Sequence, residues 1–185
     1  MRVGLMGGSF DPVHYGHLRA AQWALDVFDL NEVRMVPARQ SPFKGPCVAS
    51  DEHRRRMLDL ATSDHESLRV ERCELDREAP SYTVDTLRTL IKGTPDAHFT
   101  LIVGADAALS IESWREISEV RRMAEIRVLG RPGQAGAAEA SGAVPFPGLL
   151  ISSTEVREAI RVRRSIRYLT PESVRLYIEE KGLYQ

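Results

Sequence analysis

The chain has 185 residues, 43% of them hydrophobic, and its 25 lysines and arginines against 26 aspartates and glutamates leave a net charge of −1. This length and apolar content are sufficient for a domain with a buried core. A net charge near zero provides no general field that attracts nucleic acid, so we expect recognition of a small molecule at a local site. No apolar run approaches the roughly 20 residues that span a bilayer, so we expect no association with a membrane.

Short apolar runs typical of strands alternate along the chain with amphipathic stretches typical of helices. The expected strands are residues 3–6, 33–36, 68–73, 99–103, 126–129 and 149–151, and the expected helices are residues 18–30, 53–62, 83–91, 154–163 and 171–181. This alternation predicts an α/β fold with a doubly wound, mainly parallel sheet. We expect one domain over residues 1–185, with its C-terminal helical part (about 153–185) packed onto it. Residues 40–50 and 133–148, rich in Pro, Gly or Ala, are expected to be mobile loops.

The two cysteines, Cys47 and Cys73, lie far apart and lack the spacing of a metal or redox motif. Such cysteines are typical of reduced thiols in a cytoplasmic protein. Arg2 is followed by a strand and glycines instead of the apolar core of a signal peptide, which agrees with a cytoplasmic location.

The segment of residues 7–17, GGSFDPVHYGH, follows the first expected strand and precedes a helix. The paired Gly7 and Gly8 let backbone N–H groups approach an anion, and the following helix presents its positive end to it. His14 and His17 are three residues apart, so a helix that begins near Val13 projects both from one face. The pattern predicts a phosphate site in which two imidazoles stabilise charge.

Other interpretations of this segment are weaker. The glycine spacing matches neither the P-loop nor the dinucleotide-binding fingerprint. Zinc is disfavoured because no Cys and no suitably spaced carboxylate completes a site nearby. A purely structural His pair is the remaining alternative. The position after a first strand favours function, because open α/β sheets bind ligands there.

The motif GSFDPVHYGH resembles the GxFDPxHxGH pattern of the nucleotidyltransferase superfamily, which transfers a nucleoside monophosphate and releases pyrophosphate. Its phosphopantetheine enzymes usually carry Thr at the place of His14. Later segments are similar, in the same order, to those of the bacterial nicotinate-nucleotide adenylyltransferases: PSYTVDTL (80–87), GAD (104–106), Trp114, RPG (131–133) and ISSTEVR (151–157). The resemblance covers essentially the whole chain.

The resemblance implies a Rossmann-like fold and a reaction in which AMP passes from ATP to nicotinate mononucleotide, giving deamido-NAD and pyrophosphate in NAD biosynthesis, with Mg²⁺ accompanying ATP. It implies catalytic roles for His14, His17, Lys44 and Arg157. Lys44 lies in a loop where a long ammonium can reach a triphosphate, and the family's Pro-His-Lys element is Pro-Phe-Lys here. An ordinary solvated lysine is the alternative.

The ISSTEVR segment follows an expected strand and opens a helix, so its hydroxyls are natural caps, and Arg157 adds a guanidinium one turn later. We expect Thr154 and Arg157 to contact phosphate. The full set expected to bind ATP is Gly7, Gly8, Ser9, Phe10, His14, His17, Gly104, Asp106, Arg131, Ser152, Ser153, Thr154 and Arg157.

The resemblance places the acceptor nucleotide against Ser81, Tyr82, Thr83, Asp106 and Trp114. Amides at a helix N-terminus near Ser81 favour a carboxylate over a neutral carboxamide, and an aromatic face can stack on a pyridine ring. Trp114 is equally explained as a core indole, and Asp106 as a helix cap.

Two other functions remain open: an adenylyltransferase that prefers nicotinamide mononucleotide, and a non-catalytic adenine-nucleotide-binding protein of the same fold. A homo-oligomer is compatible with the sequence. The basic run at residues 54–56 has acidic neighbours on its expected helix, so we expect a solvated face there and no nucleic acid partner.

Overall fold

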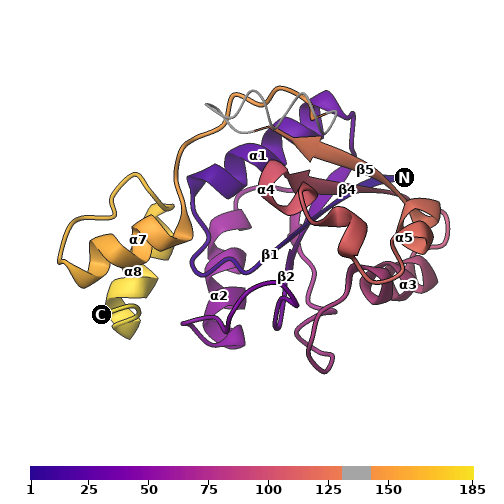
Figure 1. The fold of residues 1–185 in the computed structure, drawn as a ribbon. Helices are drawn as coiled ribbons and strands as arrows, with labels where there is room; N and C mark the ends of the chain where they lie inside the picture. The colour runs from indigo at the N-terminus through magenta and orange to yellow at the C-terminus, as the bar shows by residue number, and fades with distance from the viewer. Residues whose placement is uncertain (131–142) are drawn as a thin grey trace.

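The computed structural model describes residues 1–130 and 143–185 (Figure 1). Its sheet has five strands in the order β3-β2-β1-β4-β5, and each neighbouring pair is parallel. The strands are β1 (Arg2–Gly8), β2 (Glu32–Pro37), β3 (Leu68–Val70), β4 (His98–Gly104) and β5 (Ala124–Leu129). Because β1 lies between β2 and β4, the strand order reverses beside it. The parallel, doubly wound α/β fold predicted from the sequence is confirmed.

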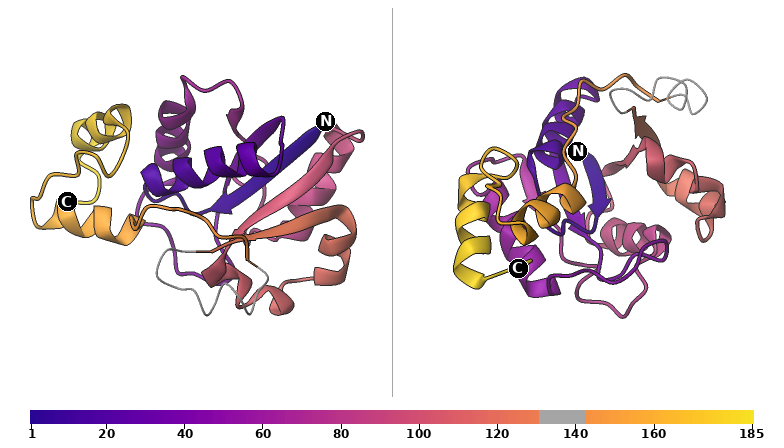
Figure 2. Two further views of the ribbon diagram at one scale, coloured as in Figure 1. Left: turned by 90° about the horizontal axis from the view of Figure 1, so that it is seen from above. Right: turned by 60° about the vertical axis from the view of Figure 1, so that its left-hand side comes forward.

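Helices cover both faces of this sheet (Figure 2). The helical segments are α1 (Tyr15–Val27), α2 (Asp51–Thr62), α3 (Thr83–Gly93), α4 (Ala105–Ala108), the 3-10 turn η1 (Ile111–Ser113), α5 (Ile117–Met123), α7 (Ser153–Arg161) and α8 (Glu172–Lys181). One apolar cluster joins the sheet to α1, α2, α7 and α8, and a second joins the opposite face to α3 and α5. Burial on both faces explains why the central strands β1 and β4 are largely apolar, whereas β5, at the edge of the sheet, exposes Glu125 and Arg127.

The side chains of the central strands alternate between the two clusters. In β1, Val3 and Leu5 belong to the cluster of α3 and α5, whereas Met6 belongs to that of α1 and α2. In β4, Ile102 faces α1, and its neighbours Leu101 and Val103 face α3. This period of two fixes the register of the strands, since a slip of one residue would exchange the two faces.

The C-terminal helices pack at one end of the molecule, beside α2 (Figure 1). Ser173 donates its hydroxyl to the carbonyl of Leu60, 3.2 Å away, and the Tyr177 hydroxyl shares a hydrogen bond of 2.8 Å with Nδ1 of His53. Tyr15, the first residue of α1, donates its backbone N–H to the carbonyl of Leu169. The end of the chain is thereby held against its beginning.

Several sequence expectations need correction. Residues 149–151 form no strand, and Leu149 and Leu150 are exposed instead of buried against a face of the sheet. The third strand ends at Val70, earlier than expected. The short segments α4, η1 and α5 were not predicted, since one or two turns carry little periodicity. Residues 40–50 form a loop as expected up to the N-cap of α2, whereas most of the loop predicted at 133–148 lies outside the described residues. No helix of the described part has the length and apolarity to cross a membrane.

Arg54 also departs from expectation, because its side chain is buried and does not lie on a solvated face. Its side chain is 0% exposed. One guanidinium nitrogen donates to the carbonyl of Ser9, 2.6 Å away, and the other contacts Asp51 at 2.6 Å. Arg54 therefore fixes the start of the glycine-rich loop to α2.

We predict that Arg54→Ala lowers the free energy of unfolding by about 3 kcal/mol, because it removes a buried cation and leaves its partners unsatisfied. Arg55→Ala is the matched control: this side chain pairs with Glu52 and Asp59 on the surface of the same helix, where such pairs contribute less than about 1 kcal/mol. Chemical denaturation measures both values. Equal losses would show that Arg54 has no special structural role.

Candidate active site

The candidate site lies where the order of the strands reverses. β1 ends at Gly8, and its neighbour β4 ends at Gly104. Because the two strands are parallel, these ends lie at the same edge of the sheet. Open α/β sheets bind ligands in the crevice at this point. Gly104 is the N-cap residue of α4, and the loop after Gly8 leads to α1. The topology therefore brings residues 7–17 and 104–106 to one edge.

The two imidazoles of the motif are stacked on each other. His14 is the N-cap residue of α1 and His17 lies one turn further, so their ring centroids are 3.7 Å apart with an angle of 23° between the planes. The ring of Phe10, only 1% exposed, meets the His17 ring edge-on at 4.9 Å. Phe10 is thus a core residue that supports His17, and any contact that it makes with ATP would come from its backbone.

Hydrogen bonding defines which nitrogen of His17 carries the proton. The backbone N–H of His14 donates to Nδ1 of His17 over 3.3 Å. An imidazole nitrogen that accepts a hydrogen bond carries no proton, so neutral His17 is protonated on Nε2. Nε2–H is the donor that a phosphate oxygen requires.

Gly16 allows this stacked arrangement. A Cβ atom at Gly16 would lie 2.9 Å from Nδ1 of His14 and 3.3 Å from the carbonyl oxygen of Ile151. Any larger residue would displace the His14 ring or the segment before α7. The second glycine of the GxFDPxHxGH pattern is therefore explained by close packing at the site.

The N-terminus of α7 contacts the same loop from the other end of the chain. Ser153 donates its hydroxyl to the carbonyl of Pro12 at 2.9 Å, and Arg157 donates to the carbonyl of Asp11 at 2.7 Å and to the Thr154 hydroxyl at 3.2 Å. Ser152 caps the helix by accepting from the backbone N–H of Glu155. The sequence-predicted groups at residues 7–17 and 152–157 are therefore brought together.

The buried carboxylate of Asp11 connects three segments. Asp11 is 4% exposed, and its oxygens accept from the backbone N–H groups of Val48 (2.7 Å) and Ala49 (3.0 Å) and from the hydroxyl of Tyr184 (2.8 Å). Burial, followed by the adjacent Asp11 charge, raises the pKa of the Tyr184 hydroxyl, which keeps it a proton donor. Sequence reasoning missed Tyr184, because no local spacing relates it to residue 11.

The expected acceptor residues lie at the start of α3. Tyr82 is the N-cap residue and Thr83 the first residue of this helix. The backbone N–H groups of its first turn therefore point out of the N-terminal end of α3. The Arg115 guanidinium lies 4.8 Å from the centre of the Tyr82 ring. Ser81 is buried and accepts from the backbone N–H of Arg39 at 3.1 Å, which joins the α3 entry to the end of β2.

A buried polar network supports this entry from beneath. Thr86 donates its hydroxyl to Glu74 at 2.6 Å and accepts from Arg77 at 2.9 Å. Burial raises the pKa of Glu74 above its usual value, although the hydrogen bonds from Thr86 and Ser81 oppose the shift.

Trp114 packs against the apolar cluster of α3 and α5. Its packing makes it partly a core residue, and stacking on a ligand stays a prediction.

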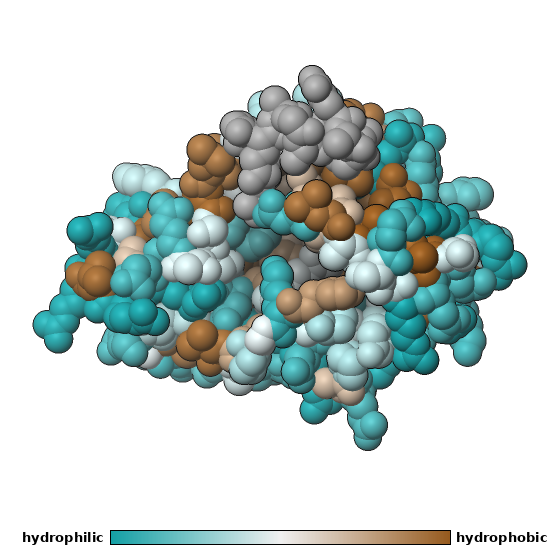
Figure 3. Space-filling model, in the orientation of Figure 1, coloured by the Kyte–Doolittle hydropathy of each residue, from teal (hydrophilic) through white to brown (hydrophobic). Residues whose placement is uncertain are grey.

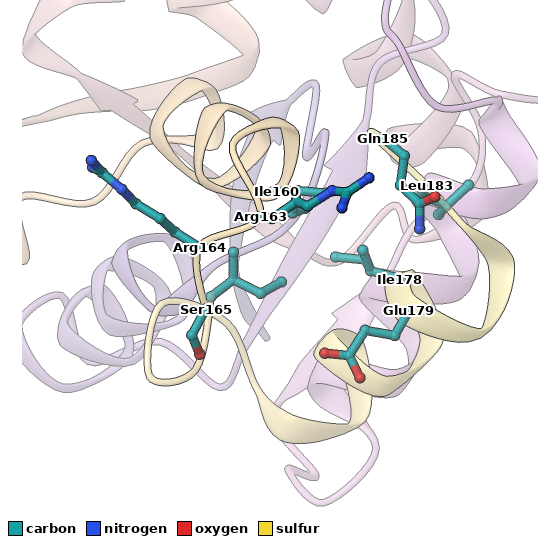
Figure 4. Close-up of a pocket in the computed structure, with 9 residues that line it drawn as sticks. Ile160, Arg163, Arg164, Ser165, Ile178, Glu179, Leu183 and Gln185 are labelled. Carbon is teal, nitrogen blue, oxygen red and sulfur yellow. The ribbon is translucent and has the colours of Figure 1, made fainter.

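Lys44 is exposed and lies on the acceptor side of the site. It lines a cavity of about 340 Å³ together with Gln40, Ser41, Pro42, Ala79, Pro80 and Tyr82. The face seen in Figure 3 is hollowed near its centre, and both hydrophilic and hydrophobic residues border the hollow. A different cavity of about 400 Å³ lies among α7, α8 and the C-terminal residues, and none of the predicted site residues lines it (Figure 4).

Asp106 and Arg131 are the remaining residues expected to bind ATP. Asp106 is exposed in the first turn of α4, immediately after the sheet edge. Arg131 lies outside the described residues. Within the described ranges, no group of three or more His, Cys, Asp or Glu residues has the arrangement of a metal site.

Comparison with known proteins agrees with this site. The family model "Cytidylyltransferase-like" matches residues 5–159, from β1 into α7. The chain belongs to the cytidylyltransferase-like family. Two curated relatives carry the name "Probable nicotinate-nucleotide adenylyltransferase" and confirm the resemblance given by the motifs. That of Geobacillus kaustophilus is 42% identical over 99% of this chain and 86% of its own. That of Thermus thermophilus is 43% identical over 100% of both chains.

A solved structure shows that this family fold is shared over the whole length. Nicotinic acid mononucleotide adenylyltransferase of Plasmodium falciparum, complexed with NaAD, superposes with a TM-score of 0.79. The superposition covers 99% of this chain and 97% of that one, at 20% sequence identity. Helix α7, which supplies Arg157, and helix α8 therefore fall within the matched length.

We predict that Gly16→Ala weakens ATP affinity by about tenfold, since the displaced His14 ring costs roughly one charge-assisted hydrogen bond. Gly93→Ala, at the C-terminal end of α3, is the matched control because a Cβ atom there meets nothing within 4 Å. Isothermal titration calorimetry with ATP measures both. Unchanged affinity in Gly16→Ala would contradict the close packing inferred at the imidazole pair.

Proposed function

We propose that the protein is a nicotinate-nucleotide adenylyltransferase, which transfers AMP from ATP to nicotinate mononucleotide and releases pyrophosphate. The observation that carries the proposal is the contact between two helix N-termini, those of α1 and α7, across residues 11–16. Each helix N-terminus attracts anions, and a triphosphate has enough charge to be shared by both. The names and coverage of the curated relatives support the same activity.

The reaction is an in-line displacement at phosphorus. An oxygen of the acceptor's 5′-phosphate forms a bond to the α-phosphorus of ATP, and the bond from that phosphorus to the bridging oxygen breaks to release pyrophosphate. The acceptor oxygen is already ionised near neutral pH, so no covalent nucleophile is required. The protein positions the two nucleotides and stabilises the charge that moves onto the leaving group.

Donors for this charge come from both ends of the chain. Nε2–H of His17 and the ring of His14 face the phosphates from α1, and Arg157 and the Thr154 hydroxyl face them from α7. Lys44 approaches from the loop after β2 and meets the triphosphate when the two nucleotides are bound. Mg²⁺ arrives with ATP as part of the substrate and is held by phosphate oxygens, since the Asp11 carboxylate is already engaged by Val48, Ala49 and Tyr184.

The acceptor binds at the entry to α3. Backbone amides at Thr83 donate to the carboxylate of the nicotinate ring, and this negative group is favoured there over a carboxamide because of the helix dipole. Tyr82, Ser81 and Trp114 shape the surroundings of the ring, and Asp106 accepts from ribose hydroxyls at the adjoining sheet edge.

The test is the rate of pyrophosphate release from ATP with nicotinate mononucleotide and, separately, with nicotinamide mononucleotide. We expect kcat/KM to be at least about tenfold higher with the nicotinate form, as one charge-assisted hydrogen bond would give. His17→Ala is expected to lower turnover at least about a hundredfold with the same preference, because it removes a preorganised donor.

The possible results have distinct meanings. Faster reaction with the amide would overturn the role given to Thr83 and favour the nicotinamide-preferring enzyme. ATP binding without turnover on either acceptor would indicate a nucleotide-binding protein that has kept the fold. Near-normal turnover in His17→Ala would remove that imidazole from the mechanism.

A further inference from the structure

The last residues of the chain turn back toward the phosphate-binding loop. Helix α8 ends at Lys181 and is capped by Gly182, whose φ of +59° is in the left-handed region, and Leu183 donates its backbone N–H to the carbonyl of Ile178. Figure 4 shows Leu183 and Gln185 beyond the end of α8, beside Ile178 and Glu179. Between them, Tyr184 is half-buried and packs against the apolar cluster of α1 and α2. Its hydroxyl reaches the Asp11 carboxylate at 2.8 Å, across 173 residues of sequence.

Asp11 makes hydrogen bonds to Arg157 and to the end of the loop that carries Lys44, two parts of the chain that the proposed reaction uses. Its backbone carbonyl accepts from the Arg157 guanidinium, so the position of Asp11 fixes this cation beside the phosphates. Its carboxylate holds the N–H groups of Val48 and Ala49, where the loop that carries Lys44 rejoins the body of the protein. A buried carboxylate requires donors on its oxygens, and Tyr184 supplies one of them.

We propose that Tyr184 is a positioning residue for adenylyl transfer, acting through Asp11 on Arg157 and on the loop of Lys44. The proposal rests on the proposed function. In this proposal the Tyr184 hydroxyl is bound to Asp11 and acts on the nucleotides only through Arg157 and the loop of Lys44. Without it, one carboxylate oxygen loses a donor, Asp11 shifts to recover one from elsewhere, and the carbonyl that orients Arg157 moves with it. Displacement of a charge-stabilising group by a fraction of an ångström is sufficient to lower the rate.

A purely structural explanation is that Tyr184 only attaches the C-terminal helices to the rest of the molecule. Tyr177 provides the comparison, since its hydroxyl also joins the C-terminal part to the body, through a 2.8 Å hydrogen bond with His53 on α2. Tyr177 has no contact with Asp11 among its hydrogen bonds in the described residues. Replacement of either tyrosine by phenylalanine removes one hydroxyl, so the two changes are chemically the same.

The experiment compares Tyr184→Phe with Tyr177→Phe in the full chain, at a temperature where circular dichroism shows both variants and the unmodified protein to be folded. We expect Tyr184→Phe to lower kcat about tenfold, because it removes a hydrogen bond to the charged Asp11 carboxylate. Tyr177→Phe is expected to change kcat less than about twofold, because it removes only the hydrogen bond to His53. The KM for nicotinate mononucleotide is expected to stay within about twofold, because the hydrogen bonds of Asp11 go to Val48, Ala49, Tyr184 and Arg157 and not to the start of α3.

A second measurement tests the route through Arg157. In an Arg157→Ala background, Tyr184→Phe is expected to lower kcat by less than about threefold, because the group that it positions is absent. Equal kcat for the unmodified protein and Tyr184→Phe, or equal losses in the two tyrosine variants, would overturn the proposal. Absence of turnover in the unmodified protein would instead overturn the proposed function.

Discussion

The arrangement of the site depends on the buried carboxylate of Asp11. A charged group removed from water must be compensated by hydrogen bonds, and here the donors come from distant parts of the chain. The amides of Val48 and Ala49 lie at the end of the loop after β2, and the Tyr184 hydroxyl lies at the C-terminus. Arg157 binds the carbonyl of the same residue. Compensation of one charge thereby assembles the segments that surround the proposed triphosphate site.

The sheet supplies the frame for this arrangement. Parallel strands β1 and β4 end at one edge, and the reversal of strand order beside β1 leaves that edge open to a ligand. Two helix N-termini then face the opening, α1 directly after the glycine-rich loop and α7 after a long excursion of the chain. Arg54 adds a buried cation beneath the loop, with a hydrogen bond to Ser9. The positive charge of the site therefore comes from backbone dipoles and from side chains together.

Much of this could be predicted from the sequence. Apolar runs indicated the five strands, because β1, β2 and β4 are largely buried and β3 and β5 are buried in part. The motif of residues 7–17 indicated the loop at the end of β1, and phosphate binding by this loop stays a prediction. The family relation predicted from the motifs is confirmed by the comparisons. Long-range partners could not be predicted: Arg54 belongs to a run of three arginines that differ only in tertiary contacts, and nothing local connects Tyr184 to Asp11. The three-residue apolar run at 149–151 was too short to distinguish a strand from an extended connection.

The central claim is that the imidazoles of α1 and the guanidinium of α7 bind one polyphosphate. A crystal structure with a non-hydrolysable ATP analogue tests it most directly. We predict that phosphate oxygens lie within hydrogen-bond distance of both His17 Nε2 and the Arg157 guanidinium, with Asp11 still bound to Tyr184. A triphosphate that contacts only one of these two groups, or that binds beside the C-terminal cavity instead, would contradict the account.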